Sequence, residues 1–438
     1  MKTREIFTKR AVVNYPFFHR TSPGWRSVFV LLIFVALAAA PKKGMFAEEP
    51  QNRDLLEFLG ALTPEQARAI AVDKSSYLVP LKRRVDTAVD RSPAYYYFLL
   101  KGISPQEKRL LDDAADGQWD HFDLLRASLI AEGVYDSAKI DGYEKQLDRI
   151  AGVIREKAQK NPGIKDNEEE LTKLIFETLH SELLTGKYDI ENTNPAVSFE
   201  TGSYNCVSAT VLFNSLAQKS GLEVCGLEMS GHVLSRAKYG TRFADLETTC
   251  PNWFSLKTAR EKQIATQSKI GGGQTVQTVA KPLTAGRTDQ VDALVQMSRN
   301  TREITDVQLV AAIYYNQGYD HWQANRLPEA AVATAKALLL DPENENAWGN
   351  MIGAINNIAL GFSMEQKRHD IAAGLLDQIE LIDPSFKDLK SNQYHVYSPW
   401  IRELVSVGQI EDAKTVYNYA VKRLPNEPRL KNLERLMR

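Results

Sequence analysis

The sequence has almost no excess of charge of either sign. Its 438 residues carry 54 Lys and Arg against 55 Asp and Glu, so the formal net charge is −1. Proteins that bind nucleic acid typically carry a basic patch, and no basic stripe interleaved with aromatic residues occurs here. Nucleic acid is therefore not expected as the main partner. The apolar fraction of 43% and the charged fraction of 25% are ordinary for a soluble globular protein long enough for two or three domains.

Cysteine is scarce as well. The three cysteines are Cys206, Cys225 and Cys250, which is too few for a disulfide scaffold. An oxidising compartment would permit a bridge between Cys225 and Cys250 and leave Cys206 as the odd thiol. There is no CxxC pair, and the seven histidines are scattered without the clustering that zinc sites use. Neither a metal nor another cofactor is expected.

One long apolar run is present, SVFVLLIFVALAAA from Ser27 to Ala40. It follows a basic segment and ends in small residues, which is the pattern of a secretory signal peptide. Because a spanning helix needs about 20 apolar residues, the run is short for a permanent anchor. Residues 1–47 are predicted to be a signal peptide or an N-terminal anchor. The body of the protein is then exported to the periplasm or secreted, free or anchored to the membrane by Ser27–Ala40.

Residues 48–190 show helical periodicity almost throughout. The clearest apolar stripe lies in Ile140–Lys157, where apolar residues recur at intervals of three and four. Further helices are predicted over Asp54–Val72, Ser104–Ala115, Trp119–Glu132 and Glu168–Leu184. No motif in this region points to chemistry, so we interpret it as a helical lead-in domain.

Residues 191–260 change from helical to β-type patterning. Val207–Ser220 has helical spacing and ends at Gly221, a residue typical of a helix C-terminus. Three short segments rich in β-formers follow, separated by turn residues: Glu223–Met229, His232–Tyr239 and Arg242–Glu247. This order predicts an antiparallel sheet with a helix beside it, and therefore an α+β fold.

Residues 261–305 lack periodicity and are predicted to form a linker or flap, whereas residues 306–438 are helical and repetitive. Prolines at 342, 384 and 425 each close a predicted helix pair. Tyr314 and Gly318 precede the first of these helix pairs. Small or apolar residues stand twelve positions before each proline (Ala330, Ala372 and Ala413) and five positions before it (Ala337, Ile379 and Ala420). The pattern resembles the tetratricopeptide repeat, although its unit is about 34 residues and the prolines are 42 and then 41 residues apart. An unrelated helical bundle is the alternative.

Cys206 stands where an irregular stretch containing Gly202 and Asn205 passes into a helix that we expect to be amphipathic. A thiol at a helix N-terminus lies near the positive end of the helix dipole, which lowers its pKa and favours the nucleophilic thiolate. The free N–H groups at the same place can hold an oxyanion. Taken alone, a buried structural cysteine remains the alternative.

His232 opens an alternating segment after a Ser-Gly pair, a position that suits a base lying beside the helix of Cys206. Two carboxylates follow in the next predicted strand, Asp245 and Glu247. Strand alternation puts both on one face, next to the histidine if the turn at Gly240 forms a hairpin. Either carboxylate could then accept the imidazole N–H and fix its tautomer.

These motifs together resemble the bacterial branch of the transglutaminase-like (papain-like cysteine hydrolase) superfamily. The matching stretches are Asn205-Cys206, Gly231-His232-Val233 and Leu246-Glu247-Thr248-Thr249. The resemblance implies a triad of Cys206, His232 and an acid. The family places an Asp four positions after an aromatic residue, so the register from Phe243 favours Glu247, while Asp245 has the expected residue type. Both candidates are kept.

The resemblance also implies an oxyanion site made by the helix-start N–H and one upstream donor, for which Tyr204 is the candidate. It implies a cysteine protease, amidase or acyltransferase that acts on a protein or peptide substrate. The C-terminal repeats would dock that substrate or a protein partner. Because members with this fold can lose activity, an inactive scaffold whose repeats mediate protein–protein interaction is the alternative.

Overall fold

The computed structural model describes residues 103–229, 231–251, 254 and 301–437. Within these ranges the chain forms two compact units, residues 105–314 and residues 315–437. The apolar segment Ser27–Ala40, the helix expected over Asp54–Val72 and residues 261–300 of the expected linker lie outside the described residues. None of the helices that the structure describes combines the length and the apolar character needed to cross a membrane.

The first unit is helical at its start, as the periodicity predicted. Its helices are α6 (Pro105–Asp113), η1 (Ala114–Asp116), α7 (Leu124–Ala131), α8 (Ser137–Lys160), α9 (Pro162–Lys165), α10 (Glu168–Glu182), α11 (Pro195–Thr201) and α12 (Cys206–Lys219). Asp123, Asp136 and Asn167 accept hydrogen bonds from the first amides of α7, α8 and α10. These caps fix where the helices begin, because a helix N-terminus leaves its first N–H groups without partners inside the helix.

A four-stranded antiparallel sheet follows α12 in the order β3-β2-β1-β4. Its strands are β1 (Glu223–Met229), β2 (His232–Tyr239), β3 (Arg242–Leu246) and β4 (Arg302–Ile304). The three predicted strands and the α+β class are confirmed. β4 was not predicted, and it places residues 302–304 of the expected linker in the sheet. Ile304 pairs with Gly226, where a Cβ would meet the Ile304 side chain at 2.5 Å.

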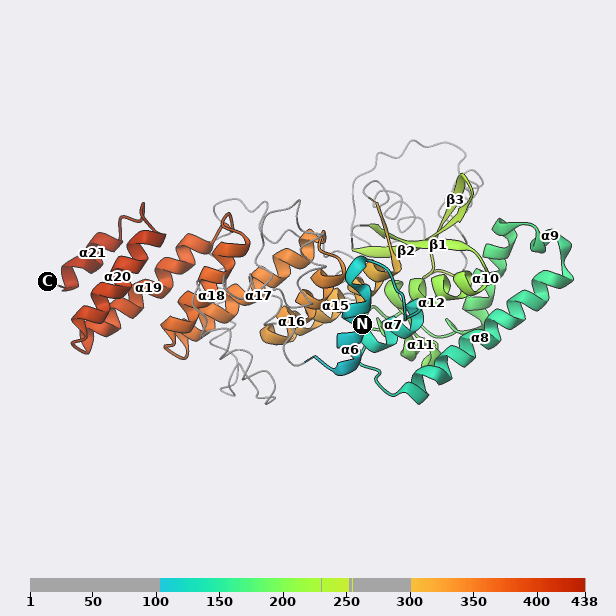
Figure 1. Ribbon diagram of the computed structural model, residues 1–438, viewed down its shortest axis with the longest axis horizontal. Helices are drawn as coiled ribbons and strands as arrows, with labels where there is room; N and C mark the ends of the chain where they lie inside the picture. Colours follow the sequence, from blue (N-terminus) through green and yellow to red (C-terminus); the bar gives the residue numbers. More distant parts are fainter. Residues whose placement is uncertain (1–102, 230, 252–253, 255–300, 438) are drawn as a thin grey trace, which may run out of the picture. The chain divides into compact units, whose positions relative to one another are not determined.

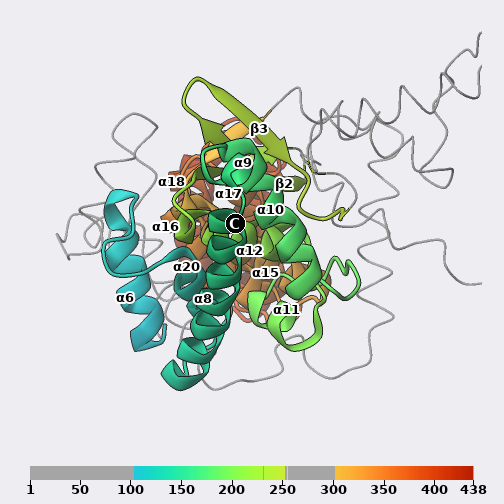
Figure 2. The ribbon, with the colours of Figure 1, turned by 90° about the vertical axis from the view of Figure 1, so that its right-hand side faces the viewer.

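The helix that carries Cys206, α12, is the centre of the first unit. It lies along the sheet beneath β1 and β2 (Figure 1) and is flanked by α8 and α10 on its other sides (Figure 2). Every residue from 207 to 217 is buried. The expectation of an amphipathic helix is therefore wrong, because the sheet covers one side of α12 and the helical lead-in covers the rest.

The second unit consists of paired helices, beginning with the part of α15 (Asp306–Gln323) beyond Tyr314. The others are α16 (Leu327–Leu340), α17 (Glu345–Met364), α18 (His369–Ile382), α19 (Leu389–Ser406), α20 (Ile410–Arg423), α21 (Leu430–Glu434) and η2 (Arg435–Met437). α16, α18 and α20 have 14 residues each, and each ends two residues before an aligned proline. The six aligned small or apolar residues are all buried, with exposed fractions of 0 or 1%.

Candidate active site

The backbone around Cys206 is fixed by an N-terminal capping box. Cys206 is the first residue of α12, and the side chain of Asn205 accepts from the N–H groups of Val207 and Ser208 at 2.9 and 3.1 Å. The Ser208 hydroxyl in turn accepts from the Asn205 N–H at 2.9 Å. The Asn205 amide also donates to Thr193 Oγ1 at 2.8 Å. The cap therefore ties the start of α12 to the preceding loop and sets the position of the thiol.

His232 is the first residue of β2, and its ring lies between Cys206 and Glu247. Its Nε2 is 2.9 Å from Oε2 of Glu247, and the ring also shares a hydrogen bond with the Cys206 thiol. Because Nε2 is engaged by the carboxylate, Nδ1 is the nitrogen left to face the thiol. The three side chains thus form one hydrogen-bonded chain from α12 to the segment after β3.

Glu247 has its carboxylate held at both oxygens. Oε2 contacts His232, while Oε1 accepts from the Thr249 N–H at 3.0 Å and from the Thr249 hydroxyl. The side chain is only 1% exposed, so solvent contributes little to its orientation. Thr248 stands between Glu247 and Thr249 in the sequence, and its hydroxyl lies 3.2 Å from the hydroxyl of Thr210 on α12. The segment that carries Glu247 therefore packs against α12, the helix that carries Cys206.

Asp245, the other candidate acid, lies with a different partner. Its two oxygens accept from Nε and Nη2 of Arg236 at 2.6 and 2.9 Å, and the guanidinium stacks on the Phe243 ring, 4.0 Å from its centroid. The structure thus brings together Cys206, His232 and Glu247 but not Asp245. β3 ends at Leu246, so the alternation that would put both acids on one face does not extend to Glu247.

The three side chains shift one another's pKa values in the directions that favour an ion pair. Burial alone would raise the pKa of Cys206, but the hydrogen bond from His232 and its charge outweigh burial and lower that pKa. Burial alone would lower the pKa of His232, but the Glu247 charge and the bonds to both neighbours raise it well above its ordinary value. Burial would raise the pKa of Glu247, and His232 and Thr249 together lower it. All three pKa shifts therefore favour the charged forms of these side chains, a thiolate, an imidazolium and a carboxylate.

The start of α12 also provides a hydrogen-bond donor for negative charge. The N–H of Cys206 has no partner among the residues that the structure describes, as expected for the first amide of a helix. This N–H lies on the residue that carries the thiol, where it could donate to an oxyanion formed by attack of that thiol. The Cys206 sulfur accepts a hydrogen bond from the Val233 N–H, which also lowers its pKa.

The resemblance suggested Tyr204 as an oxyanion donor, but its hydroxyl and its N–H have other partners. Its hydroxyl donates to the Thr249 carbonyl at 3.2 Å, and its N–H donates to the Lys187 carbonyl at 3.3 Å. Both of its donors are therefore engaged within the protein. The ring is 4% exposed and packs edge-on against His180 at 6.1 Å between centroids. These contacts give the oxyanion role of Tyr204 no support, and it stays a prediction from the resemblance.

Sequence reasoning passed over His180, which lies on α10 close to Glu247 and the Thr248 backbone. Its ring also meets Phe176, one helical turn earlier, at 4.7 Å between centroids. The available signal was this four-residue spacing, which places an imidazole on the buried face of a helix.

The cysteines do not form the bridge considered from the sequence. Cys206, Cys225 and Cys250 are all free thiols, and burial raises the pKa of Cys225 to about 11. Over the described ranges, no group of His, Cys, Asp and Glu is arranged to hold a metal ion. The Cys206 thiol is hydrogen-bonded to His232.

Comparison with protein-family models, with curated proteins and with solved structures finds no match to this chain. The site is therefore defined by its geometry, which is a hydrogen-bonded Cys–His–Glu constellation at a helix N-terminus beside an antiparallel sheet.

Proposed function

We propose that the chain is an exported transglutaminase-like cysteine hydrolase or acyltransferase that acts on protein or peptide amides. The observation that carries the proposal is the continuous contact from Cys206 to His232 to Glu247. The lowered pKa of the thiol and the raised pKa of the imidazole are the shifts that an activated cysteine nucleophile needs. A helix laid on an antiparallel sheet is in keeping with the resemblance.

In the proposed first half-reaction, the Cys206 thiolate attacks the carbonyl carbon of an amide and forms a C–S bond. Negative charge develops on the carbonyl oxygen, where the Cys206 N–H can donate to it. The His232 imidazolium gives its proton to the amide nitrogen as the C–N bond breaks, so ammonia or an amine leaves. The product is a thioester on Cys206.

In the second half-reaction, water or an amine attacks the thioester carbon. His232, now neutral, accepts the proton of the attacking group, the C–S bond breaks, and the thiolate is regenerated. Water gives hydrolysis and an amine gives transfer. Glu247 holds the ring nitrogen opposite the thiol in both steps and stabilises the imidazolium.

The second unit is proposed to be a tetratricopeptide-like repeat module that docks a substrate or a protein partner. Three 14-residue helices, α16, α18 and α20, each end before an aligned proline, and the aligned small residues are buried where helices approach closely. Repeats of this kind offer an extended surface suited to peptides. Export of the protein, with cleavage or membrane anchoring at Ser27–Ala40, is proposed from the sequence pattern alone.

A catalytically inactive scaffold is the second candidate. It is favoured by Glu247, because the family usually has Asp as the acid. One experiment separates the two candidates: incorporation of a labelled amine into a glutamine-containing protein, measured beside ammonia release. The enzyme proposal expects one or both signals from the protein and neither from Cys206→Ala with an unchanged circular dichroism spectrum. Signals absent from both proteins would support the scaffold.

A further inference from the structure

A layer of four aromatic rings lies against the segment that carries Glu247. Its members are Phe176, His180, Tyr188 and Tyr204, which we call the aromatic layer. Successive rings meet edge-on: Phe176 and His180 at 4.7 Å between centroids, His180 and Tyr204 at 6.1 Å, and Tyr188 and Tyr204 at 6.1 Å. None of these residues takes part in the half-reactions proposed above.

Tyr204 connects this layer to the acid through a series of hydrogen bonds. Its hydroxyl donates to the Thr249 carbonyl at 3.2 Å. The N–H and hydroxyl of Thr249 both donate to Oε1 of Glu247, whose Oε2 contacts His232 at 2.9 Å. The bond from Tyr204 therefore holds the residue that orients the carboxylate.

The segment that carries Tyr204 is itself firmly placed. Tyr204 forms a parallel bridge with Tyr188, and its carbonyl accepts from the Asp189 N–H at 2.8 Å. Close approach of the two segments depends on Gly202 at φ +75°, where a Cβ would lie 2.6 Å from the Gly186 nitrogen. Tyr204 is only two residues before Cys206, so one short segment places both the nucleophile and the support of the acid.

His180 is the member of the aromatic layer that could carry a charge near Glu247. Burial lowers the pKa of His180 to about 4, so its ring is neutral at neutral pH. The Thr248 backbone and the Glu247 charge raise the pKa of this ring, but burial outweighs both. A cation at this position would compete with His232 for the charge of Glu247. The layer instead leaves His232 as the cation that Glu247 stabilises.

From these contacts we propose that Tyr204 is a positioning residue, which keeps Glu247 directed at His232 by holding the Thr249 carbonyl against the aromatic layer. The proposal rests on the proposed function, since it assumes that the Cys206, His232 and Glu247 contacts activate the thiol. It goes further by giving the tyrosine hydroxyl a part in setting the reactivity of a side chain that it does not touch.

The test is the pH dependence of Cys206 alkylation by iodoacetamide in Tyr204→Phe, which removes the hydroxyl and keeps the ring. We expect the midpoint to move to higher pH and the rate below the midpoint to fall about threefold to tenfold, the usual effect of one hydrogen bond. Thr249→Val, which removes a hydroxyl donor to the same carboxylate, should shift the midpoint in the same direction. If Tyr204→Phe does not fold, an unmoved midpoint in Thr249→Val still overturns the inference, because the bond from Tyr204 acts on Glu247 only through Thr249.

Tyr143→Phe is the matched control. It also removes a tyrosine hydroxyl that donates to a side chain, Glu200, and its expected midpoint is that of the unchanged protein. A midpoint that stays in place in both Tyr204→Phe and Thr249→Val, with unfolding temperatures lowered as in the control, would mean a purely structural role and overturn the inference. An ordinary thiol midpoint of roughly 8.5 in the unchanged protein would instead overturn the proposed function together with the inference.

Discussion

Nε2 of His232 lies 2.9 Å from Oε2 of Glu247, whose carboxylate is 1% exposed. A buried carboxylate is strongly destabilising when it is alone, because it loses its hydration. Here it accepts from Thr249 twice and faces an imidazole that also contacts Cys206. Removal of this one carboxylate should therefore change the protonation of both other side chains.

Glu247→Gln tests that dependence. The amide keeps nearly the same shape but carries no charge, so the pKa of His232 should fall and the Cys206 thiolate should lose its cation. The alkylation rate of Cys206 at pH 6.5 should fall by at least about tenfold, since one pKa unit corresponds to a factor of ten. This rate is measured by quenching the alkylation at several times and determining the alkylated fraction of the Cys206 peptide by mass spectrometry.

Asp245→Asn is the matched control for that variant. It neutralises the carboxylate two residues earlier, whose partner is Arg236. It should leave the rate within about twofold, because this carboxylate contacts Arg236 and not His232. An equal loss of reactivity in both variants, or a loss in Asp245→Asn alone, would contradict the assignment of Glu247 as the acid.

Gly318→Ala tests the close approach of α15 and α16 in the second unit. A Cβ at this position would meet Thr334 Oγ1 at 2.5 Å, so the substitution should lower stability by about 1–3 kcal/mol, as overpacking usually does. Adding Thr334→Ala removes the clashing hydroxyl and should recover at least half of the loss. The midpoint of thermal unfolding, followed by circular dichroism, measures both effects.

Gly349→Ala on α17 is the control for Gly318→Ala. No atom lies within 4 Å of the Cβ it would add, so helix propensity alone should make it neutral or stabilising by up to about 1 kcal/mol. If the stability changes of Gly318→Ala and Thr334→Ala add strictly in the double variant, the packing of α15 on α16 does not depend on this contact, and the prediction is contradicted.

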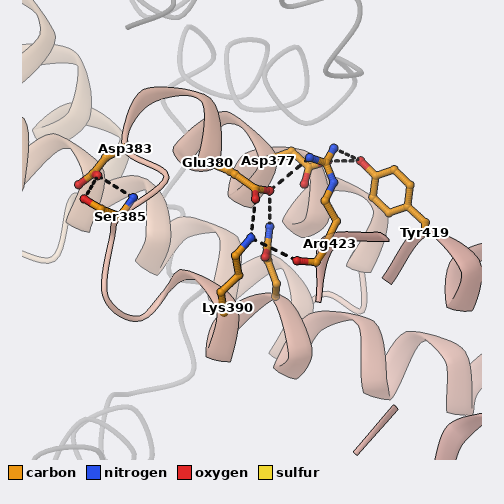
Figure 3. Close-up of polar contacts among 8 residues, drawn as sticks. Asp377, Glu380, Asp383, Ser385, Lys390, Tyr419 and Arg423 are labelled. Atoms are coloured by element: carbon orange, nitrogen blue, oxygen red, sulfur yellow. Dashed lines mark hydrogen bonds and ion pairs between the residues drawn. The ribbon is translucent and has the colours of Figure 1, made fainter. Parts of the chain in front are cut away.

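A polar cluster joins α18, α19 and α20, as Figure 3 shows. Arg423 on α20 reaches Asp377 at 3.3 Å and Glu380 at 3.2 Å, both on α18. Tyr419 donates to Asp377, and Lys390 on α19 pairs with Glu380. The Asp377 side chain is 2% exposed. Its burial outweighs these favourable contacts and raises its pKa to about 6.

The raised pKa of Asp377 predicts a stability that falls with rising pH. In the unfolded chain this group titrates near 3.9, so between that pH and about 6 the folded state binds more protons than the unfolded state. The contribution of Asp377 to the free energy of unfolding is complete below the pKa it has in the unfolded chain. That contribution is lost as the pH rises to the pKa it has in the folded protein. Asp377→Asn does not titrate, and relative to it the unchanged protein should lose on the order of 2–3 kcal/mol between pH 4 and 7.

Urea unfolding at several pH values measures that difference. Asp383→Asn is the control, because Asp383 accepts from Ser385 in the turn after α18 rather than joining the cluster (Figure 3). A stability difference between Asp377→Asn and the unchanged protein that does not vary from pH 4 to 7 would contradict the prediction.

Local signals in the sequence located much of the fold. Asn205 before Cys206 predicts where α12 begins, because an asparagine cap satisfies the first amides of a helix. The turn residues Gly231 and Gly240, which adopt φ of 70° and 59°, divide β1, β2 and β3. The three aligned prolines predict the ends of α16, α18 and α20, because proline disfavours a helical residue before it.

Features that depend on distant partners were not predictable in this way. β4 has three residues and exists through its pairing with β1, about 75 positions earlier in the sequence. The amphipathic reading of α12 failed because burial on all sides is decided by neighbours, not by the helix itself. The choice of acid did have a signal: a two-residue turn at Gly240 sets Arg236 opposite Asp245, which removes Asp245 from the site.

The pH dependence of Cys206 alkylation in the unchanged protein, compared with His232→Ala, tests the central claim most directly. The account predicts a midpoint well below the ordinary thiol value of roughly 8.5 and a return to or above that value in His232→Ala, where burial of the thiol is no longer offset. A midpoint near the ordinary value in the unchanged protein, unaltered by His232→Ala, would contradict the account.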